Sequence, residues 1–274
     1  MPVITLATDI GQNDFLVAAI KGQLLSFRST YNIIDVTHQL SSNHLLQSAY
    51  ICNSAYAYFP AGTYHFIVEN LYFHTPAEYL IAKYKDGYIA CPNNGILPLI
   101  TNHDLQDVVS IELDSDKTLL NITQTIASAF TRLSDGEDLN SLGNKPTKIH
   151  AINPLPEPTN PDRLEAHIIF VDKFENVVIN LTKKEFESRR NGRRFQIIIK
   201  RNDIIDTISN SYASVTEGEK LAWFNSAGYL ELGMNKGNMA SLFGLKSFKE
   251  IDTSKAISHA DKSYYQTIRI NFFE

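Results

Sequence analysis

Short apolar runs alternate with helical segments along the first part of this sequence, and this alternation constrains the fold more than any other feature. Residues 3–8 form an apolar, β-branched run, and residues 14–27 follow with apolar side chains at helical spacing. A second run at 32–36 precedes a helical segment at 45–56, and a third run covers 64–68. Because strands that alternate with helices pair in parallel, we expect an α/β N-terminal domain with a largely parallel sheet.

Polar residues stand at the carboxyl end of each of these predicted strands. Ligands of open α/β sheets bind outside these strand ends, where the topology brings together side chains that are distant in sequence. This edge of the sheet is therefore predicted to carry a binding or catalytic site. The polar pairs are Thr8-Asp9, Thr37-His38 and Glu69-Asn70.

The N-terminal domain continues with further regular segments. The apolar stretches at 79–91 and 107–113 are predicted to be strands, and 123–133 has the apolar spacing of a helix. Ser41 or Ser42 is expected to cap the second helix. The predicted inner face of the last helix consists of Ile126, Ala129, Phe130 and Leu133.

A stretch rich in Gly, Asn and Pro at 136–163 separates this domain from the rest of the chain. We place the domain boundary there, with an α/β domain at 1–150 and a second domain at 151–274. Short alternating or β-branched runs with few helices predict a small all-β, barrel-like second domain. These runs are 166–171, 177–181, 195–200, 220–224, 229–233 and 267–273.

The formal net charge of −5 and the pI of about 5.9 provide no overall positive field for a nucleic-acid backbone. Nucleic acid is therefore not expected as a partner. The dense basic cluster surrounds Asn191-Gly192, a dipeptide typical of type I′ hairpin turns. We interpret it as a solvated hairpin tip, with an anion or partner contact as the alternative. The cluster consists of Arg189, Arg190, Arg193 and Arg194.

The two cysteines, Cys52 and Cys91, lie far apart in apolar segments, which predicts buried thiols rather than a disulfide framework. No run of about 18 apolar residues occurs, and the N-terminus lacks the basic and apolar regions of a secretion signal. The sequence therefore predicts a cytoplasmic protein with no membrane partner.

Several familiar motifs are absent from the sequence. There is no Gly-x-Gly-x-x-Gly after the first strand and no Walker loop, so no dinucleotide or triphosphate site is indicated. The lack of a Gly-x-Ser-x-Gly elbow argues against an α/β-hydrolase. The eight histidines show no metal-ligand spacing, so we expect neither a metal nor a cofactor.

Five segments, in order along nearly the whole chain, resemble the motifs of one family. Residues 8–15 (TDIGQNDF) are similar to Thr-Asp-Phe-Gly-x-x-Asp, and 34–38 (IDVTH) to Ile-x-Asp-Ile-Ser-His. Residues 92–97 (PNNGIL) are similar to Pro-Asp-Asn-Gly-Leu-Leu, and 171–176 (VDKFEN) to Ile-Asp-x-Phe-Gly-Asn. The family's C-terminal signature resembles 225–231 (NSAGYLE), 235–238 (NKGN) and 242–245 (LFGL). Together they resemble the S-adenosylmethionine (SAM) hydrolases, which are related to the SAM-dependent fluorinases and chlorinases.

This resemblance implies an α/β domain followed by a β-barrel domain, and a homotrimer that binds SAM or adenosine between neighbouring subunits. It assigns Asp9 to the ribose diol, because a carboxylate can accept two hydrogen bonds from vicinal hydroxyls. The alternative for Asp9 is a turn residue at a strand end. Asp14 either shapes the same pocket or caps the first helix.

The resemblance implies that the second domain holds the rest of SAM. Asp172 is matched to the partner of the methionine ammonium, with Asn176 and Ser226 nearby, and Phe174 packs on the ligand. The alternative is a strand-end Asp beside a core Phe. The positions matched to backbone contacts with adenine are Met234 and Lys236.

The implied reaction is an in-line displacement at C5′ of SAM by an oriented water, which releases adenosine and methionine. The family is understood to use an Asp in a Val-Asp-Pro-Gly-Val-Gly motif, a following Arg and a later His. Residues 68–76 read VENLYFHTP, so Glu69 replaces the Asp and the glycines are missing. No Arg occurs between positions 28 and 132, and no His between 103 and 150.

These departures leave three hypotheses open. The first is a SAM hydrolase of weak or altered activity, with Glu69 as the catalytic carboxylate. His74 is either a substitute for a missing catalytic group or a solvated loop histidine. The second is a non-catalytic SAM or adenosine binder, or a structural trimer. A halogenase is the third, and it is disfavoured because the loop that would hold a halide has been rebuilt.

Overall fold

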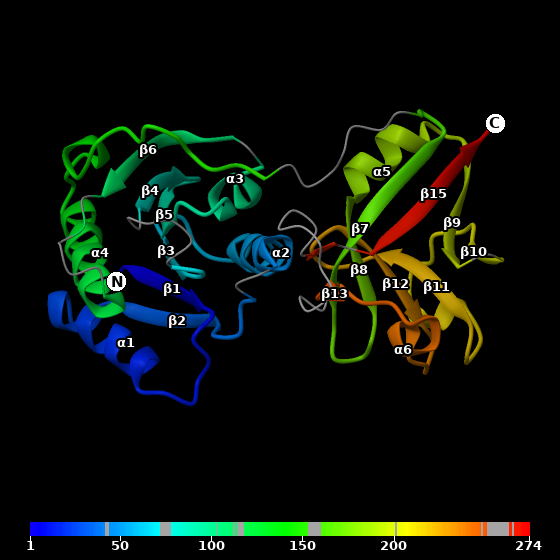
Figure 1. Cartoon of the computed structure of the whole chain (residues 1–274), viewed down its shortest axis with the longest axis horizontal. Coiled ribbons are helices and arrows are strands. Elements are labelled where there is room, and N and C mark those ends of the chain that lie inside the picture. Colours follow the sequence, from blue (N-terminus) through cyan, green and yellow to red (C-terminus); the bar gives the residue numbers. More distant parts are fainter. Residues whose placement is uncertain are drawn as a thin grey trace, which may run out of the picture. The chain divides into compact units, whose positions relative to one another are not determined.

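The computed structural model describes residues 1–41, 44–71, 78–102, 104–111, 113, 118–152, 160–200, 202–247, 249–250, 263–264 and 266–274. The chain forms two units, Met1–Ile152 and Asn153–Glu274, and each contains its own main sheet (Figure 1). None of the helices in the described part of the chain has the length and apolar character needed to span a bilayer.

The N-terminal unit is organised by a six-stranded sheet of order β2-β1-β3-β5-β4-β6. The pairings β2–β1, β1–β3 and β3–β5 are parallel, as expected, whereas β5–β4 and β4–β6 are antiparallel. The sheet is therefore mixed, which corrects the expectation of a largely parallel one. The strands are β1 (Val3–Thr8), β2 (Asn32–Thr37), β3 (Tyr64–Val68), β4 (Tyr79–Tyr84), β5 (Gly87–Pro92) and β6 (Gln106–Ile111).

A tight hairpin between β4 and β5 causes this difference. The apolar stretch at 79–91 folds back at Lys85, which takes a positive φ of 52°. Gly87 then lets the chain pass close to the start of β3, because a Cβ there would lie 2.0 Å from the backbone oxygen of Thr63. The next amide, that of Tyr88, donates to this same oxygen at 3.2 Å. The predicted strand region is thus two antiparallel strands.

Helices cover both faces of this sheet, with α1 and α4 on one side and α2 and α3 on the other (Figure 1). The side chains of Ile20 and Leu24 in α1 are buried, and so are all four predicted inner residues of α4. In this unit the core combines these helices with strand residues such as Ile4 and Phe66. The helices are α1 (Leu16–Phe27), α2 (Leu45–Tyr56), α3 (Ile96–Ile100) and α4 (Leu119–Ser134), followed by the 3-10 turn η1 (Leu139–Ser141).

The start of α2 differs from the prediction. Its N-cap residue is His44, and no side chain caps it. Ser41 contributes its backbone carbonyl instead, which accepts from the amide of His44 at 2.8 Å. Ser42 lies outside the described residues. The expected serine cap is therefore wrong for Ser41, because the helix begins too far along the chain for its hydroxyl to occupy the cap position.

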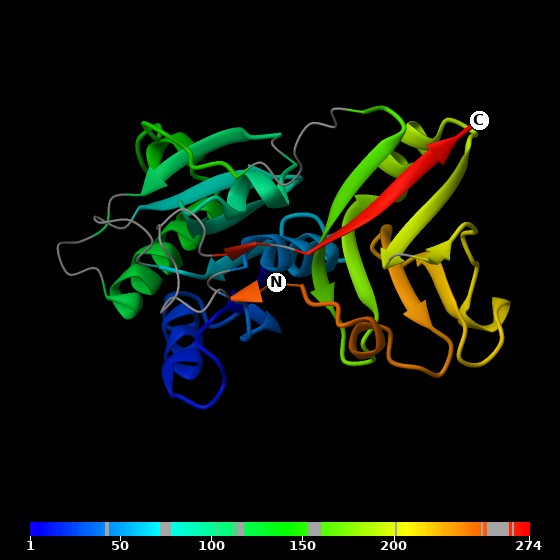
Figure 2. The ribbon, with the colours of Figure 1, turned by 45° about the vertical axis from the view of Figure 1, so that its right-hand side comes forward.

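The C-terminal unit contains a seven-stranded antiparallel sheet of order β10-β9-β15-β7-β8-β12-β11. Its strands wrap around one apolar core (Figure 2). The segment that follows the edge strand β10 lies beside the other edge strand, β11, where the amide of Ser209 donates to the carbonyl of Ala222 at 2.7 Å. The sheet is a nearly closed barrel, as predicted. Its strands are β7 (Arg163–Val171), β8 (Val177–Thr182), β9 (Arg194–Lys200), β10 (Asp203–Ile205), β11 (Lys220–Phe224), β12 (Tyr229–Met234) and β15 (Thr267–Phe273).

Smaller elements complete this unit. The short strands β13 (Lys249–Glu250) and β14 (Ser263–Tyr264) pair with each other in a separate ribbon. The helical elements are α5 (Lys183–Arg190), η2 (Tyr212–Ser214) and α6 (Met239–Phe243).

The arginine-rich segment is the end of a helix and not a hairpin tip. Thr182 and Glu185 form a reciprocal capping box that starts α5. Asn191 follows the helix with φ 45° and closes it in the left-handed conformation, so Asn191-Gly192 is a helix-to-strand turn. Arg193 reaches back to Asp162, with 2.5 Å between Nη1 and Oδ1. The interpretation as a hairpin is therefore wrong.

Both cysteines are buried free thiols, as predicted. Cys52 lies on the inner face of α2 and Cys91 lies in β5. Burial raises the pKa of the Cys52 thiol to about 12, so it stays protonated at physiological pH.

Candidate functional site

Two carboxylates lie at the carboxyl ends of the paired strands β1 and β3. Asp9 follows β1 and Glu69 follows β3. Their backbones are joined, because the amide of Asp9 donates to the carbonyl of Val68 at 3.0 Å. The amide of Asn70 in turn donates to Asp9 Oδ2 at 2.8 Å. The parallel pairing of β1 and β3 thus brings together residues that are 60 positions apart in sequence.

The Glu69 carboxyl group is fully buried. The hydroxyl of Ser48 donates to its Oε1, and within the described residues its Oε2 has no hydrogen-bond partner. Burial raises the pKa of Glu69 to about 8, the Ser48 hydrogen bond opposes this rise, and the charge of Asp9 adds to it. A carboxyl group poised near neutral pH, with one oxygen unpartnered, is suited to exchange a proton with a bound molecule.

Ser48 and Asn94 hold Glu69 in place, and the sequence assigned a site role to neither, although Asn94 lies within the 92–97 motif. Ser48 lies on the buried face of α2 between Leu45 and Cys52. A polar residue at apolar helical spacing was the signal available for it. Asn94 is buried, and its side-chain amide donates to the backbone carbonyl of Glu69 at 3.0 Å.

A buried histidine fixes the loop that follows β1. The hydroxyl of Thr8 lies 3.0 Å from His38 Nδ1, and His38 Nε2 lies 3.2 Å from Asp35 Oδ1. Backbone hydrogen bonds tie the same segments together, from Gly11 N to the carbonyl of His38 at 2.7 Å and from Leu40 N to the carbonyl of Thr8 at 2.9 Å. The position of Asp9 is therefore determined by β2 as well as by β3.

The structure assigns no site role to the other two residues predicted in this unit, Asp14 and His74. Asp14 is exposed, and its carboxylate accepts from the amide of Phe15 at 2.5 Å. Phe15 occupies the N-cap position of α1, and no side chain caps that helix, so capping by Asp14 is not observed. The role of Asp14 in a pocket stays a prediction. His74 lies outside the described residues.

In the C-terminal unit, Asp172 organises the loop between β7 and β8. Its Oδ1 accepts from the amides of Phe174 and Asn176, both at 2.8 Å, and its Oδ2 accepts from the side-chain amide of Asn176 at 3.0 Å. Asn176 is buried, whereas the Phe174 ring is 63% exposed and is not a core residue. A carboxylate has about four lone-pair positions, so Asp172 retains capacity for one further donor.

The remaining predicted residues lie around β12. Ser226 is exposed in the turn between β11 and β12, and Met234 ends β12. Lys236 takes a positive φ of 54° and pairs with Glu217, with 2.8 Å between Nζ and Oε2. The Lys236 side chain is therefore engaged on the surface, and a contact of its backbone with a ligand stays a prediction.

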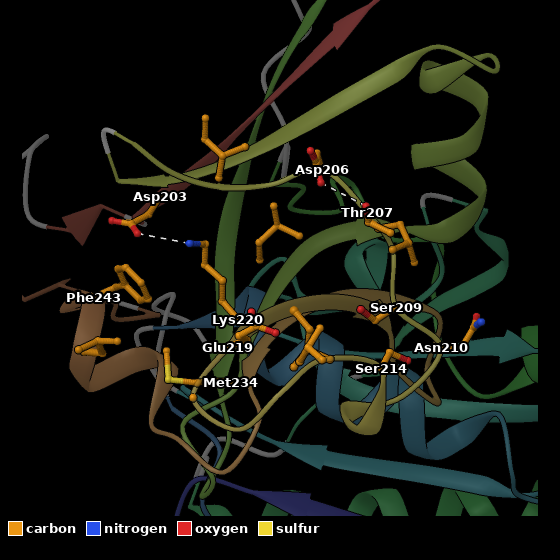
Figure 3. A pocket seen from close by; sticks show the side chains of 17 residues that line it. Asp203, Asp206, Thr207, Ser209, Asn210, Ser214, Glu219, Lys220, Met234 and Phe243 are labelled. Atoms are coloured by element: carbon orange, nitrogen blue, oxygen red, sulfur yellow. Dashed lines mark hydrogen bonds and ion pairs between the residues drawn. The ribbon is translucent and has the colours of Figure 1, made fainter.

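A cavity of about 700 Å³ opens at the seam of the barrel, and Met234 is among the residues that line it (Figure 3). Lys220 of β11 points across it toward Asp203 of β10, at 3.4 Å from Nζ to Oδ1. Ile204, Leu221 and Phe243 supply apolar lining. Lys220 partly offsets the negative charge of the carboxylates that line the cavity, so the lining is neither strongly charged nor strongly apolar.

Comparisons with known proteins bear on what these groups do. The chain is 24% identical over 265 residues to the (R)-S-adenosyl-L-methionine hydrolase of Methanocaldococcus jannaschii, a match that covers 92% of this chain and 95% of that protein. It is 21% identical over 294 residues to a fluorinase of Actinoplanes sp., covering 93% and 98%. A solved structure of an uncharacterized conserved protein from Thermotoga maritima has the same fold, with a TM-score of 0.77, 20% identity and coverage of 98% and 99%.

Family models cover most of the chain. The model of the SAM hydroxide adenosyltransferase N-terminal domain matches residues 4–143, and that of the C-terminal domain matches residues 166–252. The resemblance stated from the five sequence motifs is thereby confirmed. This chain belongs to the SAM hydroxide adenosyltransferase family.

Proposed function

We propose that this protein hydrolyses SAM to adenosine and methionine by displacement at C5′, with Glu69 as the base that holds and deprotonates the attacking water. One observation carries this proposal. Glu69 is buried at the strand end beside Asp9, one oxygen is fixed by Ser48, and the other has no partner within the described residues. Membership of the family and the names of its hydrolase relatives support SAM as the substrate.

The reaction requires one base and no covalent intermediate. The water oxygen forms a bond to C5′ as the C5′–sulfur bond breaks, and the electron pair of that bond returns to sulfur, which becomes the neutral thioether of methionine. The water proton passes to the Glu69 carboxylate and then to solvent. A fixed, buried carboxylate suits this role, because orientation and exclusion of bulk water both favour attack by a single water.

In the proposed trimer, neighbouring subunits would contribute the ligand contacts. Asp9 would accept hydrogen bonds from the ribose diol, and Asp172 would receive the methionine ammonium at its remaining lone pair. The exposed ring of Phe174 is available to pack on the ligand, as a core phenylalanine would not be. The backbones of Met234 and Lys236 would contact adenine, and Asn176 and Ser226 would complete the site.

Asp9→Ala is expected to weaken adenosine binding by about 1.5 to 3 kcal/mol, the usual contribution of hydrogen bonds to a charged group. This corresponds to a roughly 10- to 150-fold higher dissociation constant, measured by calorimetry. Asp86→Ala provides the control, because Asp86 is exposed in the β4–β5 turn. An unchanged dissociation constant in Asp9→Ala would refute the assignment of the diol.

The proposed activity is tested by incubating the purified protein with SAM and separating the products by chromatography. We expect adenosine and methionine in equal amounts, at a rate above that of SAM alone. Binding of SAM in calorimetry without adenosine formation would instead make the protein a non-catalytic binder, in agreement with its missing Arg and His. Loss of SAM that depends on added halide would identify a halogenase.

The proposal also includes assembly and location. We propose a homotrimer in which each SAM site is formed between subunits, and a cytoplasmic location. The family resemblance supports the trimer as a proposal, and the sequence supports the location. Light scattering on the eluted protein would give about three times the chain mass of 30.9 kDa, and a monomer at every concentration tested would contradict the trimer.

A further inference from the structure

A buried carboxylate on β12, that of Glu231, is bound by three uncharged donors. The hydroxyl of Tyr212 and the indole nitrogen of Trp223 donate to Oε1 at 3.1 and 3.0 Å, and the side-chain amide of Asn225 donates to Oε2 at 3.0 Å. Only 7% of Glu231 is exposed. Its neighbours along the strand, Leu230 and Leu232, are fully buried apolar residues. A carboxylate at such a position is costly unless hydrogen bonds satisfy it, and here they do.

Each donor belongs to a different segment of the barrel. Tyr212 lies in η2, Trp223 lies in β11, and Asn225 begins the turn that leads to β12. Asn225 continues the network into that turn, because its Oδ1 accepts from the amides of Ala227 at 3.0 Å and Tyr229 at 3.2 Å. The conformation of the turn that carries Ser226 therefore depends on Glu231 through one intermediate residue.

The other branch of the network extends toward the Asp172 loop. Tyr212 and Asn176 both close over Gly233, where a Cβ would lie 3.0 Å from Tyr212 Cε1 and 2.9 Å from Asn176 Oδ1. Asn176 is in turn bound by Asp172. The Glu231 carboxylate thus determines where Tyr212 packs, and the Tyr212 ring lies beside Asn176 over Gly233. A side chain at position 233 would require Asn176 or Tyr212 to shift.

We propose that Glu231 is a positioning residue for ligand binding, which holds the Ser226 turn and the Tyr212 ring in the arrangement that receives SAM. This inference rests on the proposed function, because it takes Ser226 and Asn176 to contact the ligand. Glu231 itself does not touch the ligand in this arrangement. It acts by accepting three hydrogen bonds that fix the orientation of their donors.

The test is Glu231→Gln, which keeps the size of the side chain but replaces one acceptor oxygen with a donor. At least one of the three donors then faces an amide NH₂ and loses its acceptor. We expect the dissociation constant for SAM to rise about tenfold or more, with kcat at saturating SAM within about twofold of the wild type. Trp223 is the single tryptophan of the chain, so its fluorescence emission in the free protein should also shift.

Glu165→Gln is the matched control, because Glu165 is an exposed carboxylate on β7 with ion-pair partners of its own. It should leave SAM affinity and the emission spectrum unchanged. Tyr212→Phe removes one donor and retains the ring, so it should raise the dissociation constant in the same direction by about two- to fivefold. This second variant decides the matter if Glu231→Gln does not fold.

The outcomes separate this inference from the proposed function. A folded Glu231→Gln protein with the wild-type dissociation constant would overturn the positioning role, and so would a lowered kcat at unchanged affinity. A lower melting temperature without any change in affinity would mean that Glu231 only stabilises the barrel. If the wild type binds SAM but forms no adenosine, the hydrolase proposal fails while the binding comparison still tests Glu231.

Discussion

Replacing Glu69 with Gln is expected to lower the rate of adenosine formation from SAM by about 10² to 10⁴, the usual contribution of a positioned general base. The amide has nearly the same shape as the carboxyl group but cannot accept a proton from water. SAM affinity should change little, because the proposed contacts to the ribose and methionine ends come from other residues. Single-turnover measurements with product quantification separate the two effects.

The pH dependence of the wild-type rate is a second test of Glu69 as the base. Burial raises the pKa of Glu69 to about 8, so only about a tenth of the molecules carry the ionised base at pH 7. The rate should therefore increase with pH and level off above about 8. Ser48→Ala should move this rise to higher pH, because the Ser48 hydrogen bond favours the ionised form.

Glu137→Gln serves as the control for this experiment. Glu137 is paired with Arg132 on the surface of the same unit, away from the strand ends. Its replacement should leave both the rate and the pH profile unchanged. Full activity in Glu69→Gln would show that another group activates the water, and the proposed mechanism would then be wrong.

Much of the fold follows from local patterns in the sequence. The first three strands were predicted because short β-branched runs alternate with helical segments, and the inner face of α4 because its apolar residues recur at helical spacing. The hairpin at β4 and β5 was missed, although Asp86-Gly87 is a dipeptide typical of hairpin turns, because the apolar residues on both sides were interpreted as one strand region. The role of Gly87 depends on contact with Thr63, which no local pattern reveals. A local turn therefore made this sheet mixed.

The misread arginine segment shows that local signals also compete. Asn191-Gly192 is compatible with a hairpin turn and with the end of a helix. The Thr182 to Glu185 capping box lies upstream, and it starts a helix whose end places Asn191 in the left-handed conformation. The capping signal was present in the sequence, and it was a better guide to the structure of this segment than the Asn191-Gly192 dipeptide.

The candidate site could be only half predicted for a related reason. The strand-end carboxylates Asp9 and Glu69 were found because topology fixes where strand ends lie. Ser48 and Asn94 were not, since they reach Glu69 from α2 and from the segment after β5. Glu231 lies within a recognised motif, but its three partners come from separate segments that fold together only in the barrel.

The burial of Glu69 should also be measurable as a pH-dependent loss of stability that Glu69→Gln removes. Its pKa is about 8 in the folded protein against 4.5 for the free side chain, so the folded state retains a proton that the unfolded state releases between these values. Stability therefore falls as pH rises from about 4.5 to about 8, by roughly 4 to 5 kcal/mol in total. The Gln variant has no proton to retain and lacks this contribution.

Urea denaturation of the wild type and of Glu69→Gln between about pH 5 and 9 tests this directly, because the difference between the two proteins cancels all other titrating groups. The wild type should lose stability relative to the variant as pH rises, and the difference should become constant above about pH 8. Glu137→Gln should show no such trend in this range, since the Arg132 hydrogen bond lowers the pKa of Glu137 to about 2. Parallel curves for the wild type and Glu69→Gln would mean that Glu69 is ionised throughout. The raised pKa of Glu69, from which the rise of the rate with pH is predicted, would then be wrong.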